Sequence, residues 1–472
     1  MATPAPTAEV RRAALVVATI SAFLTPFLGS SVSVALPTIG RDFHMDAIAL
    51  SWISTAYLLA AAVALVPIGR IADIHGRKRI WLYGVILYTG ASVLCAAAPS
   101  GAWLIAFRCL QAIGSTLIYG TGLAVLTSVF PREQRGRVIG FNVAAVYTGL
   151  SVGPFVGGLL TTQWGWRSMF LSTVPFGLIA IYLILTRLKG EWAEARGERF
   201  DVVGTILYGL ALVVLMYGLS ALPAIRGAAL AAAGVAGLAA FTWWELHTPD
   251  PVLEMRLFRD NLVFALSNLA ALINYGATVA VTFLLSLYLQ YVQGMSPAEA
   301  GLVLVSQPVV MMLVSLQAGR LSDRVEPRIV VSAGMAITAA GLLGLVWLTP
   351  ATPLAFIVAM LVVQGIGFGL FSSPNANAIM SAVAPRYYGV ASGILSTMRA
   401  TGQMVGMAIT MVVVSLYIGQ EPVSADNLPA FIAATQTACL LFAVLTVGGV
   451  VASLVRGKVP DADPAPDPAR GT

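Results

Sequence analysis

Charged residues are scarce in this chain of 472 residues: they make up 10% of it, against 58% hydrophobic residues, and the mean hydropathy is +0.86. A soluble globular chain carries about 25% charged residues, because its surface faces water. Charge this sparse cannot cover such a surface, so most of the outside of the folded chain must face lipid. The composition therefore predicts an integral membrane protein.

Residue types that carry catalysis or bind metals are also few. The three cysteines, Cys95, Cys109 and Cys439, lie far apart in apolar runs without C-x-x-C spacing, and the three histidines have no metal-binding spacing. There is no H-E-x-x-H, G-x-S-x-G or P-loop pattern, and no pair of carboxylates within an apolar run. These absences argue against a metal centre, a bound cofactor, a membrane-embedded enzyme and an ATP-driven pump.

A basic balance, with a sequence pI of about 9.3, raises the question of nucleic acid. The basic residues are scattered at the ends of apolar runs and form no single patch. A membrane chain needs Lys and Arg in its cytoplasmic loops, which explains the balance without a nucleic-acid partner.

Long apolar runs dominate what is present. The first, Ala13–Gly40, is too long for the apolar core of a signal peptide and suits a spanning helix of roughly 20 residues. The runs are continuously apolar and do not alternate, which indicates helices and not barrel strands. Fourteen spans are predicted, at Leu15–Leu36, Ala49–Ile68, Ile80–Ala98, Trp103–Leu123, Val138–Leu160, Met169–Leu185, Val202–Leu219, Ala228–Trp244, Leu262–Leu289, Ala300–Leu316, Ile329–Leu348, Ala355–Phe371, Val390–Ile418 and Phe431–Val455.

The distribution of positive charge supports this number of spans. With the N-terminus inside, only Arg41, Arg167 and Arg226 fall in external segments, and Arg108 and Arg399 fall within spans. All other Lys and Arg residues are then cytoplasmic, as the positive-inside rule requires. The chain is predicted to be multi-pass with both termini in the cytoplasm.

A short motif occurs twice. Gly69-Arg70-Ile71-Ala72-Asp73 follows the second predicted span, and Gly319-Arg320-Leu321-Ser322-Asp323 follows the tenth. Matching positions in two halves are typical of a two-fold transporter, if spans seven and eight are an insertion. The predicted organisation is a cytoplasmic tail (1–12), a six-helix bundle (13–187), a linker with two extra helices (188–260), a second six-helix bundle (261–456) and a disordered cytoplasmic tail (457–472).

Three motifs resemble those of the major facilitator superfamily, and most closely its fourteen-helix drug:proton antiporter branch. The loop at 69–79 is similar to G-x-L-A-D-x-x-G-R-[KR]-[KR], residues 108–114 are similar to R-x-x-Q-G-x-G, and residues 149–158 match G-x-x-x-G-P-x-x-G-G. The resemblance covers roughly residues 12 to 456. It implies an all-α membrane fold with two six-helix bundles and two extra central helices.

The resemblance also implies a function. Members of this branch are secondary transporters of the plasma (inner) membrane that export small organic molecules, drug-like compounds or metabolites, by rocker-switch alternating access and in exchange for protons. They work as monomers without a cofactor. Two alternatives stay open: an uptake transporter or metabolite or anion facilitator without proton coupling and, from a different class, a membrane receptor or enzyme.

Positions that match the family motifs are expected to act in gating. The glycines of the span-five motif let a neighbouring helix approach closely, and Pro154 adds a bend. Asp73 is expected to take part in a latch at the cytoplasmic mouth. The predicted gating residues are Gly69, Asp73, Gly76, Arg77, Lys78, Gly149, Gly153, Pro154, Gly157, Gly158, Gly319 and Asp323.

Two arginines within spans are the sharpest candidates for a substrate site, because a charge there costs about 2.5–3.5 kcal/mol and usually faces a cavity. Arg108 has Gln111 one turn on, and Arg399 has Gln403 at i+4. Other polar side chains within spans are expected to line the same cavity. The predicted cavity residues are Arg108, Gln111, Trp52, Tyr57, Asn142, Asn268, Asn274, Gln307, Asn375, Arg399 and Gln403, with Tyr147 and Asn377 as further polar groups and Phe23, Phe27 and Met311 as apolar wall.

One feature departs from the family. Many members of the antiporter branch carry an aspartate in span one, where this chain has Leu28, and none of the 21 Asp and Glu residues lies deep in a predicted span. A proton-coupling carboxylate is usually buried in the membrane. The remaining candidates are Asp73 and Asp42, at opposite mouths. With arginines but no acid within the spans, an anionic or zwitterionic substrate is as well supported as a cationic drug.

Overall fold

The structure is a computed structural model, and it describes residues 7–130, 132–191, 200–222, 224–249, 251–322, 325–383, 388–419 and 421–456. Within these residues it is helical throughout, without a strand. The longer helices of the first part are α1 (Ala8–Phe43), α2 (Ala47–His75), α3 (Arg77–Ala96), α4 (Gly101–Val129) and α5 (Arg132–Trp164), followed by α6 (Arg167–Leu171), α7 (Val174–Thr186), α8 (Val202–Ser220), α9 (Ile225–His247) and α10 (Arg256–Asp260). The remainder is α11 (Leu262–Leu287), η1 (Tyr288–Val292), α12 (Pro297–Leu304), α13 (Ser306–Ser322), α14 (Pro327–Leu345), α15 (Leu354–Ser381), α16 (Tyr388–Ile418), η3 (Ala425–Asn427) and α17 (Leu428–Val455).

Fourteen helical segments of the described residues are long and apolar enough to cross a membrane, which confirms the predicted number. Three of the predicted spans are each built from two pieces. Helices α6 and α7 share one span, α11 continues into the π-helical turn η1, and α12 and α13 share another. Pro175 lies in the first turn of α7, where its missing N–H costs no helical bond.

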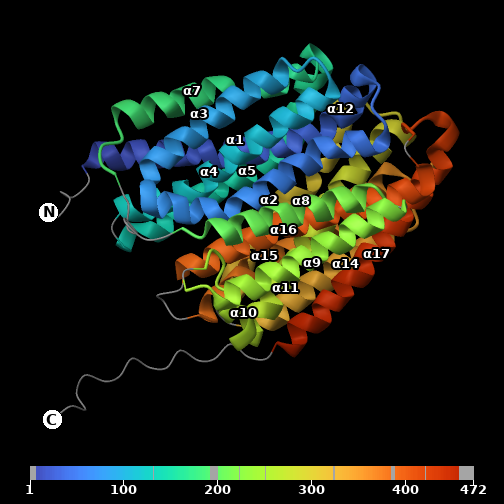
Figure 1. The fold of residues 1–472 in the computed structure, drawn as a ribbon. Helices are drawn as coiled ribbons and strands as arrows, with labels where there is room; N and C mark the ends of the chain where they lie inside the picture. Colours follow the sequence, from blue (N-terminus) through green and yellow to red (C-terminus); the bar gives the residue numbers. More distant parts are fainter. Residues whose placement is uncertain are drawn as a thin grey trace, which may run out of the picture.

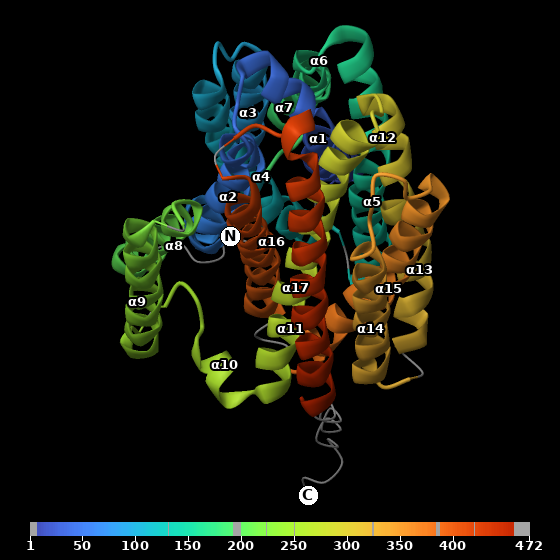
Figure 2. The ribbon, with the colours of Figure 1, turned by 90° about the vertical axis from the view of Figure 1, so that its right-hand side faces the viewer.

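The helices form two groups that lie side by side in Figure 1, with α1–α7 in one and α11–α17 in the other. Helices α2 and α16 join the groups on one side, and α5 and α12 join them on the other. The hairpin of α8 and α9 packs beside the first pair, and α10 leads from the hairpin to α11 (Figure 2). The predicted domain limits stay predictions.

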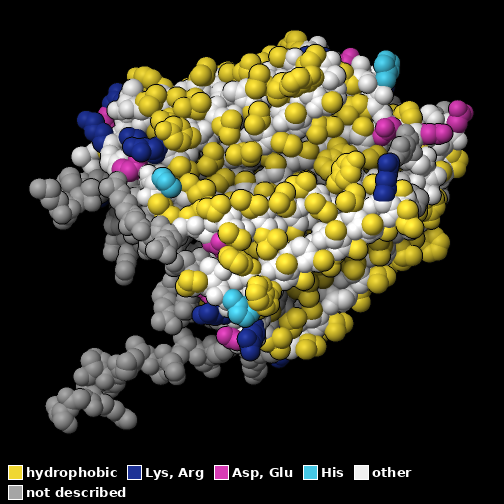
Figure 3. All heavy atoms as spheres, viewed as in Figure 1, with side chains coloured by type: hydrophobic (Ala, Val, Ile, Leu, Met, Phe, Trp, Pro, Cys, Tyr) yellow, Lys and Arg dark blue, Asp and Glu magenta, His cyan; other side chains and the backbone are white. Residues whose placement is uncertain are grey.

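The start of α1 and the end of α17 lie at the same end of the bundle, which we call the terminal end (Figure 1). Hydrophobic side chains cover the middle of the visible face, whereas dark blue Lys and Arg side chains gather mainly at the terminal end (Figure 3). This surface matches a bilayer core about 30 Å thick with charged groups at its edges.

Some predicted residues cannot be placed. Asp323 and the tail 457–472 lie outside the described residues. Asp73 belongs to α2, but its side chain, like those of Arg70 and Arg320, is outside the description.

Candidate functional site

Arg108 lies inside the first group of helices, on α4, and only 2% of it is exposed. Its Nε donates to the carbonyl of Ile53 on α2 over 3.3 Å, and its Nη1 donates to Oε1 of Gln111. The Gln111 amide donates in turn to the Ser92 hydroxyl on α3 over 2.8 Å. A buried charge that is met by several hydrogen bonds holds its neighbours in place. This chain of contacts therefore ties together α2, α3 and α4.

An aromatic contact completes the surroundings of Arg108. The guanidinium carbon lies 4.2 Å from the centre of the Tyr57 ring, close enough for a cation–π interaction. Arg108, Gln111 and Tyr57 thus lie together, and in this conformation they are enclosed within one group. Their contact with a substrate stays a prediction.

Arg399 has a different setting, between the two groups of helices. It lies on α16, with its guanidinium carbon 5.2 Å from the centre of the Tyr275 ring on α11. It is also within electrostatic range of Tyr119 on α4 and Tyr147 on α5. Phenols from both groups therefore surround this cation.

No hydrogen bond or ion pair fixes Arg399 among the described residues. Tyr119 is 40% exposed although it also lies close to Thr25 on α1. Arg399 is likewise only partly buried. A partly open cation without an acidic partner can bind an anionic group from solution.

The other predicted cavity residues are spread over several environments. Asn268, Asn274, Gln307 and Asn375 are buried. Asn142 donates to the Ala18 carbonyl over 3.2 Å, which joins α5 to α1. Trp52 and Gln403 are partly buried, and their side chains make no hydrogen bond to another described residue. Of this set, Arg399 and Tyr147 come together between the groups.

A buried arginine that sequence reasoning missed lies next to Asn375. Arg456, just past the end of α17, is 2% exposed, and its Nη1 donates to Ser267 Oγ over 2.7 Å and to Asn375 Oδ1 over 3.2 Å. Burial lowers the pKa of Arg456 to about 10. Its position at a helix end resembled an ordinary loop charge, so no sequence signal separated it. Asn375 is thus held in a bundle contact.

The glycines of the span-five motif allow α5 to approach two helices. A Cβ at Gly149, Gly153 or Gly157 would overlap atoms of α1, and the Ser31 hydroxyl donates to the Gly153 carbonyl over 2.8 Å. On the other side, a Cβ at Gly158 would overlap the backbone of α12, and one at Gly301 would overlap the Pro154 carbonyl. We call these two contacts the glycine seam. One face of the seam lies within the first group, and the other crosses between the groups.

Away from the terminal end, the groups are joined by direct hydrogen bonds. Ser286 Oγ donates to the Ser33 carbonyl over 2.6 Å, and Gln290 Nε2 donates to the Val34 carbonyl over 2.9 Å. The backbone N–H of Ala47 donates to the Glu421 carbonyl over 3.3 Å. The α1–α11 contact is therefore closed at this end.

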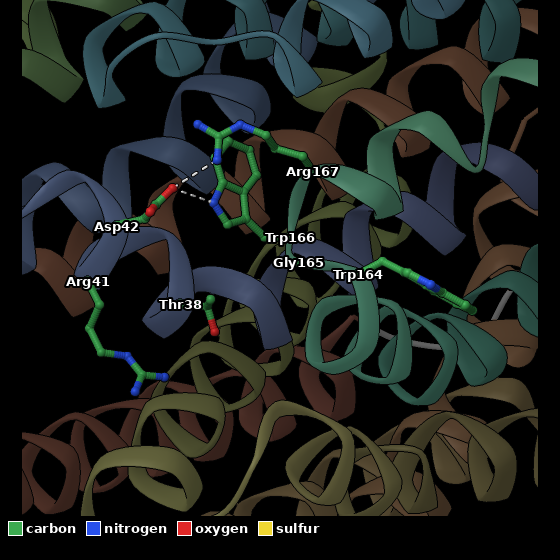
Figure 4. Close-up of a pocket in the computed structure, with 7 residues that line it drawn as sticks. All are labelled: Thr38, Arg41, Asp42, Trp164, Gly165, Trp166 and Arg167. Atoms are coloured by element: carbon green, nitrogen blue, oxygen red, sulfur yellow. Dashed lines mark hydrogen bonds and ion pairs between the residues drawn. The ribbon is translucent and has the colours of Figure 1, made fainter.

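A surface hollow of about 510 Å³ lies at the same end (Figure 4). Asp42 lies at its edge, where its Oδ2 accepts from Trp166 Nε1 over 3.0 Å and from Arg167 Nη1 over 2.9 Å. Arg167 also lies over the Trp166 ring. Asp42, one of the two predicted coupling acids, is thus held as a paired carboxylate in this conformation.

The predicted gating loop connects α2 to α3. Gly76 has φ of 110°, a backbone region that side chains rarely adopt, which explains the glycine. Glu191 accepts from the backbone N–H of Lys78 over 2.9 Å, and Arg77 donates to Ser128 Oγ over 3.1 Å. A carboxylate at the start of a helix interacts favourably with its dipole. The loop is therefore tied both to α4 and to the segment after α7.

The acids include one that sequence reasoning passed over. Glu245 lies near the end of α9, just past the predicted span Ala228–Trp244, and it is 1% exposed because the segment that follows folds back over it.

Within the described residues, no cluster of three or more His, Cys, Asp or Glu side chains could hold a metal ion.

The sequence matches one family model and several known proteins. A family model described as Major Facilitator Superfamily matches residues 18–407 and 267–472. The chain is 33% identical to Multidrug resistance protein Stp of Mycobacterium tuberculosis (strain H37Rv), over 80% of this chain and 71% of that protein. It is 34% identical to Cephamycin export protein CmcT of Amycolatopsis lactamdurans (85% and 84%), and 29% identical to Riboflavin transporter RibZ of Clostridioides difficile (strain 630) (84% and 86%).

Solved structures share the fold. A bacterial homolog of the human lysosomal transporter Spinster, in an inward-facing and unoccupied conformation, matches with a TM-score of 0.68 and 19% identity, over 95% of this chain and 97% of that one. A POT family transporter in complex with a thioalcohol-conjugated peptide matches with a TM-score of 0.70 and 14% identity (91% and 94%). At these identities the likeness concerns the fold alone.

Proposed function

Because the chain belongs to the major facilitator superfamily, we propose that it is a secondary transporter of the plasma membrane that exports small organic molecules by alternating access. Its family and its structural relatives are transporters and not enzymes. Its partners are accordingly the lipid bilayer and a small-molecule substrate.

The observation that carries the proposal is the position of Arg399. A cation between the two groups of helices, surrounded by phenols from both and paired with no described acid, is a binding group that both halves can share. In two-fold transporters the substrate site lies at such an interface, near the middle of the membrane. Arg399 is therefore proposed as the main substrate contact.

This position favours a substrate class. A guanidinium binds a carboxylate or phosphate through two parallel hydrogen bonds, and tyrosine rings add stacking and hydroxyl contacts. The proposed substrate is an anionic or zwitterionic molecule with a flat, partly apolar body. A purely cationic drug would meet repulsion from Arg399.

The conformation fits one step of alternating access. The α1–α11 contact is closed away from the terminal end. If both termini are cytoplasmic, as the positive charge at that end favours, the structure is an inward-facing state. Exchange with an outward-facing state would require the Ser286 and Gln290 hydrogen bonds to break.

Two relatives named as exporters or resistance proteins support export. A second candidate function is uptake or facilitated diffusion of a metabolite, because another relative is named as a riboflavin transporter. Coupling to protons stays a proposal in either case, with Asp73 and Asp42 as the candidate groups. The transporter is proposed to work as a monomer.

The test uses the purified chain in lipid vesicles, with uptake of labelled anionic, zwitterionic and cationic aromatic compounds. We expect transport of an anionic or zwitterionic compound, lowered at least tenfold by Arg399→Gln and retained in the control Arg226→Gln, at an exposed position in the first turn of α9. An imposed pH gradient should accelerate the wild type if protons are exchanged. Transport that is equal in Arg399→Gln and wild type would contradict the proposed site, and indifference to the gradient would remove the antiport.

A further inference from the structure

Two carboxylates meet in the linker hairpin, outside the proposed substrate site. Asp201 is the residue just before α8, and Glu245 lies in the last turn of α9. A Cβ built on Gly204 would overlap Oδ2 of Asp201 and also Oε1 of Glu245, so the two oxygens lie together over the bare Cα of this glycine. We call Asp201, Gly204 and Glu245 the hairpin clasp.

The two acids are not equivalent. Asp201 accepts from two donors, the Gly204 N–H over 2.8 Å and Trp244 Nε1 over 2.9 Å. Such donors favour the charged form of a carboxyl group. Glu245 accepts at Oε2 from the Leu253 N–H over 2.8 Å, and the backbone N–H of Val252 also lies near the carboxylate, while the buried Oε1 has no hydrogen-bond partner.

Among the described residues, no cation compensates the charge of Glu245. The charged side chains that act on it are Asp201 and Glu254, both acidic, and no Lys, Arg or His of the described residues is among them. On its own helix, His247 bonds instead to the Trp243 carbonyl over 2.7 Å. A buried carboxylate beside a second one, without a cation, is expensive in its charged form.

We propose that the hairpin clasp is a proton-binding site, in which Glu245 carries a proton on Oε1 and donates it to Oδ2 of Asp201. One proton gives the unpartnered oxygen a hydrogen bond and removes the repulsion between the two acids. The bond ties the start of α8 to the end of α9, and through Leu253 to the segment that leads to α10 and α11.

The clasp has a consequence for the whole transporter. Helix α8 packs on α2 and α16, the pair that joins the two groups of helices. Tyr208 of α8 also donates to the Ala62 carbonyl of α2 over 3.4 Å. Loss of the proton would loosen the hairpin beside this interface, so the site is expected to respond to pH on the side of the terminal end.

The full chain, purified in detergent, tests the site by two measurements. Infrared difference spectroscopy during a pH titration reports the carbonyl band of a protonated carboxylic acid, and the unfolding temperature is followed over the same pH range. Glu245→Gln is the matched variant, because its amide keeps the Leu253 contact and can donate to Asp201 at any pH. Glu421→Gln, at an exposed acid, is the control.

Exposed acids also contribute to this band at low pH, so the signal of Glu245 is the part of the band that remains after they have lost their protons, which we call the high-pH acid band. We expect the wild type and the control to show the high-pH acid band, to lose it as pH rises further, and to lose thermal stability in the same range. Glu245→Gln should lack that band and that part of the pH dependence. Asp201→Asn serves as a second variant and should shift the titration. A high-pH acid band that persists in Glu245→Gln overturns the proposal, as does a wild-type stability whose pH dependence equals that of Glu245→Gln. A titration abolished by sodium but not by choline would also overturn it, because a metal cation would then occupy the site.

Discussion

Arg108 shows how a single buried charge can organise its neighbours. Its contacts with Ile53 and Tyr57 join α4 to α2, and the Gln111–Ser92 bond extends the network to α3, while almost none of Arg108 is exposed. Removing one partner of such a network leaves the others buried without hydrogen bonds, at about 1–3 kcal/mol for each orphaned group. The effect should therefore appear in stability as well as in transport.

For Arg108→Ala we expect a lower unfolding temperature, corresponding to a loss of about 1–3 kcal/mol or more, together with loss of transport. Thermal unfolding in detergent is the measurement. Arg226→Ala, at an exposed position in the first turn of α9, is the control and should unfold like the wild type. An Arg108→Ala chain as stable as this control would show that the network does not hold the helices.

Single residues were predictable from sequence only where local pattern decides their surroundings. An arginine in an apolar run signals a special environment, which is why Arg108 and Arg399 could be singled out. Sequence could not show that one is enclosed and the other lies between the groups, because that depends on how four or more helices pack. Glu245 and Arg456 were missed for the same reason: both end helices, and only tertiary contacts bury them.

At the level of elements, the glycine seam sets the approach of α5 to α1 and α12. Helices in lipid associate through close packing of small residues, since apolar side chains gain little by leaving lipid tails. A side chain added at Gly157 would push α5 away from α1 within the first group. A side chain added at Gly301 would push α12 away from α5 and so separate the two groups. The two faces can therefore be tested separately.

We expect Gly157→Val to destabilise the fold by about 1–3 kcal/mol, because added atoms must force α1 and α5 apart. Gly301→Val should instead weaken the closed contact between α5 and α12 and so shift the population of conformations. Gly448→Val is the control, since a Cβ there meets nothing within 4 Å. Unfolding temperature and the accessibility of a cysteine placed at Ser286 (Ser286→Cys) separate the two effects. Equal behaviour of Gly157→Val and Gly448→Val would contradict the seam.

The number and approximate positions of the spanning helices could be predicted from the sequence, because hydropathy over about 20 residues is a local property. All fourteen predicted spans have a helical counterpart in the described residues. Irregularities inside spans did not follow, such as the break between α12 and α13 near Val305 and the π-helical turn at Tyr288–Val292. Those depend on contacts with neighbouring helices, which a hydropathy pattern does not contain.

On the scale of the whole molecule, two groups of helices meet along two lateral contacts and close at one end. The bonds from Ser286 and Gln290 to the α1 backbone are few and polar. Each hydrogen bond contributes only about 0.5–1.5 kcal/mol net, so the closed end can open without unfolding either group. This is the physical requirement for alternating access.

The most direct test of this account locks the closed end. Ser33→Cys and Ser286→Cys would be combined in a chain whose three native cysteines are replaced, and joined by a short, cleavable bifunctional reagent. We predict that the joined transporter binds substrate but no longer moves it across the vesicle membrane, and that cleavage of the reagent restores transport. Full transport by the joined protein would contradict alternating access between these two groups of helices.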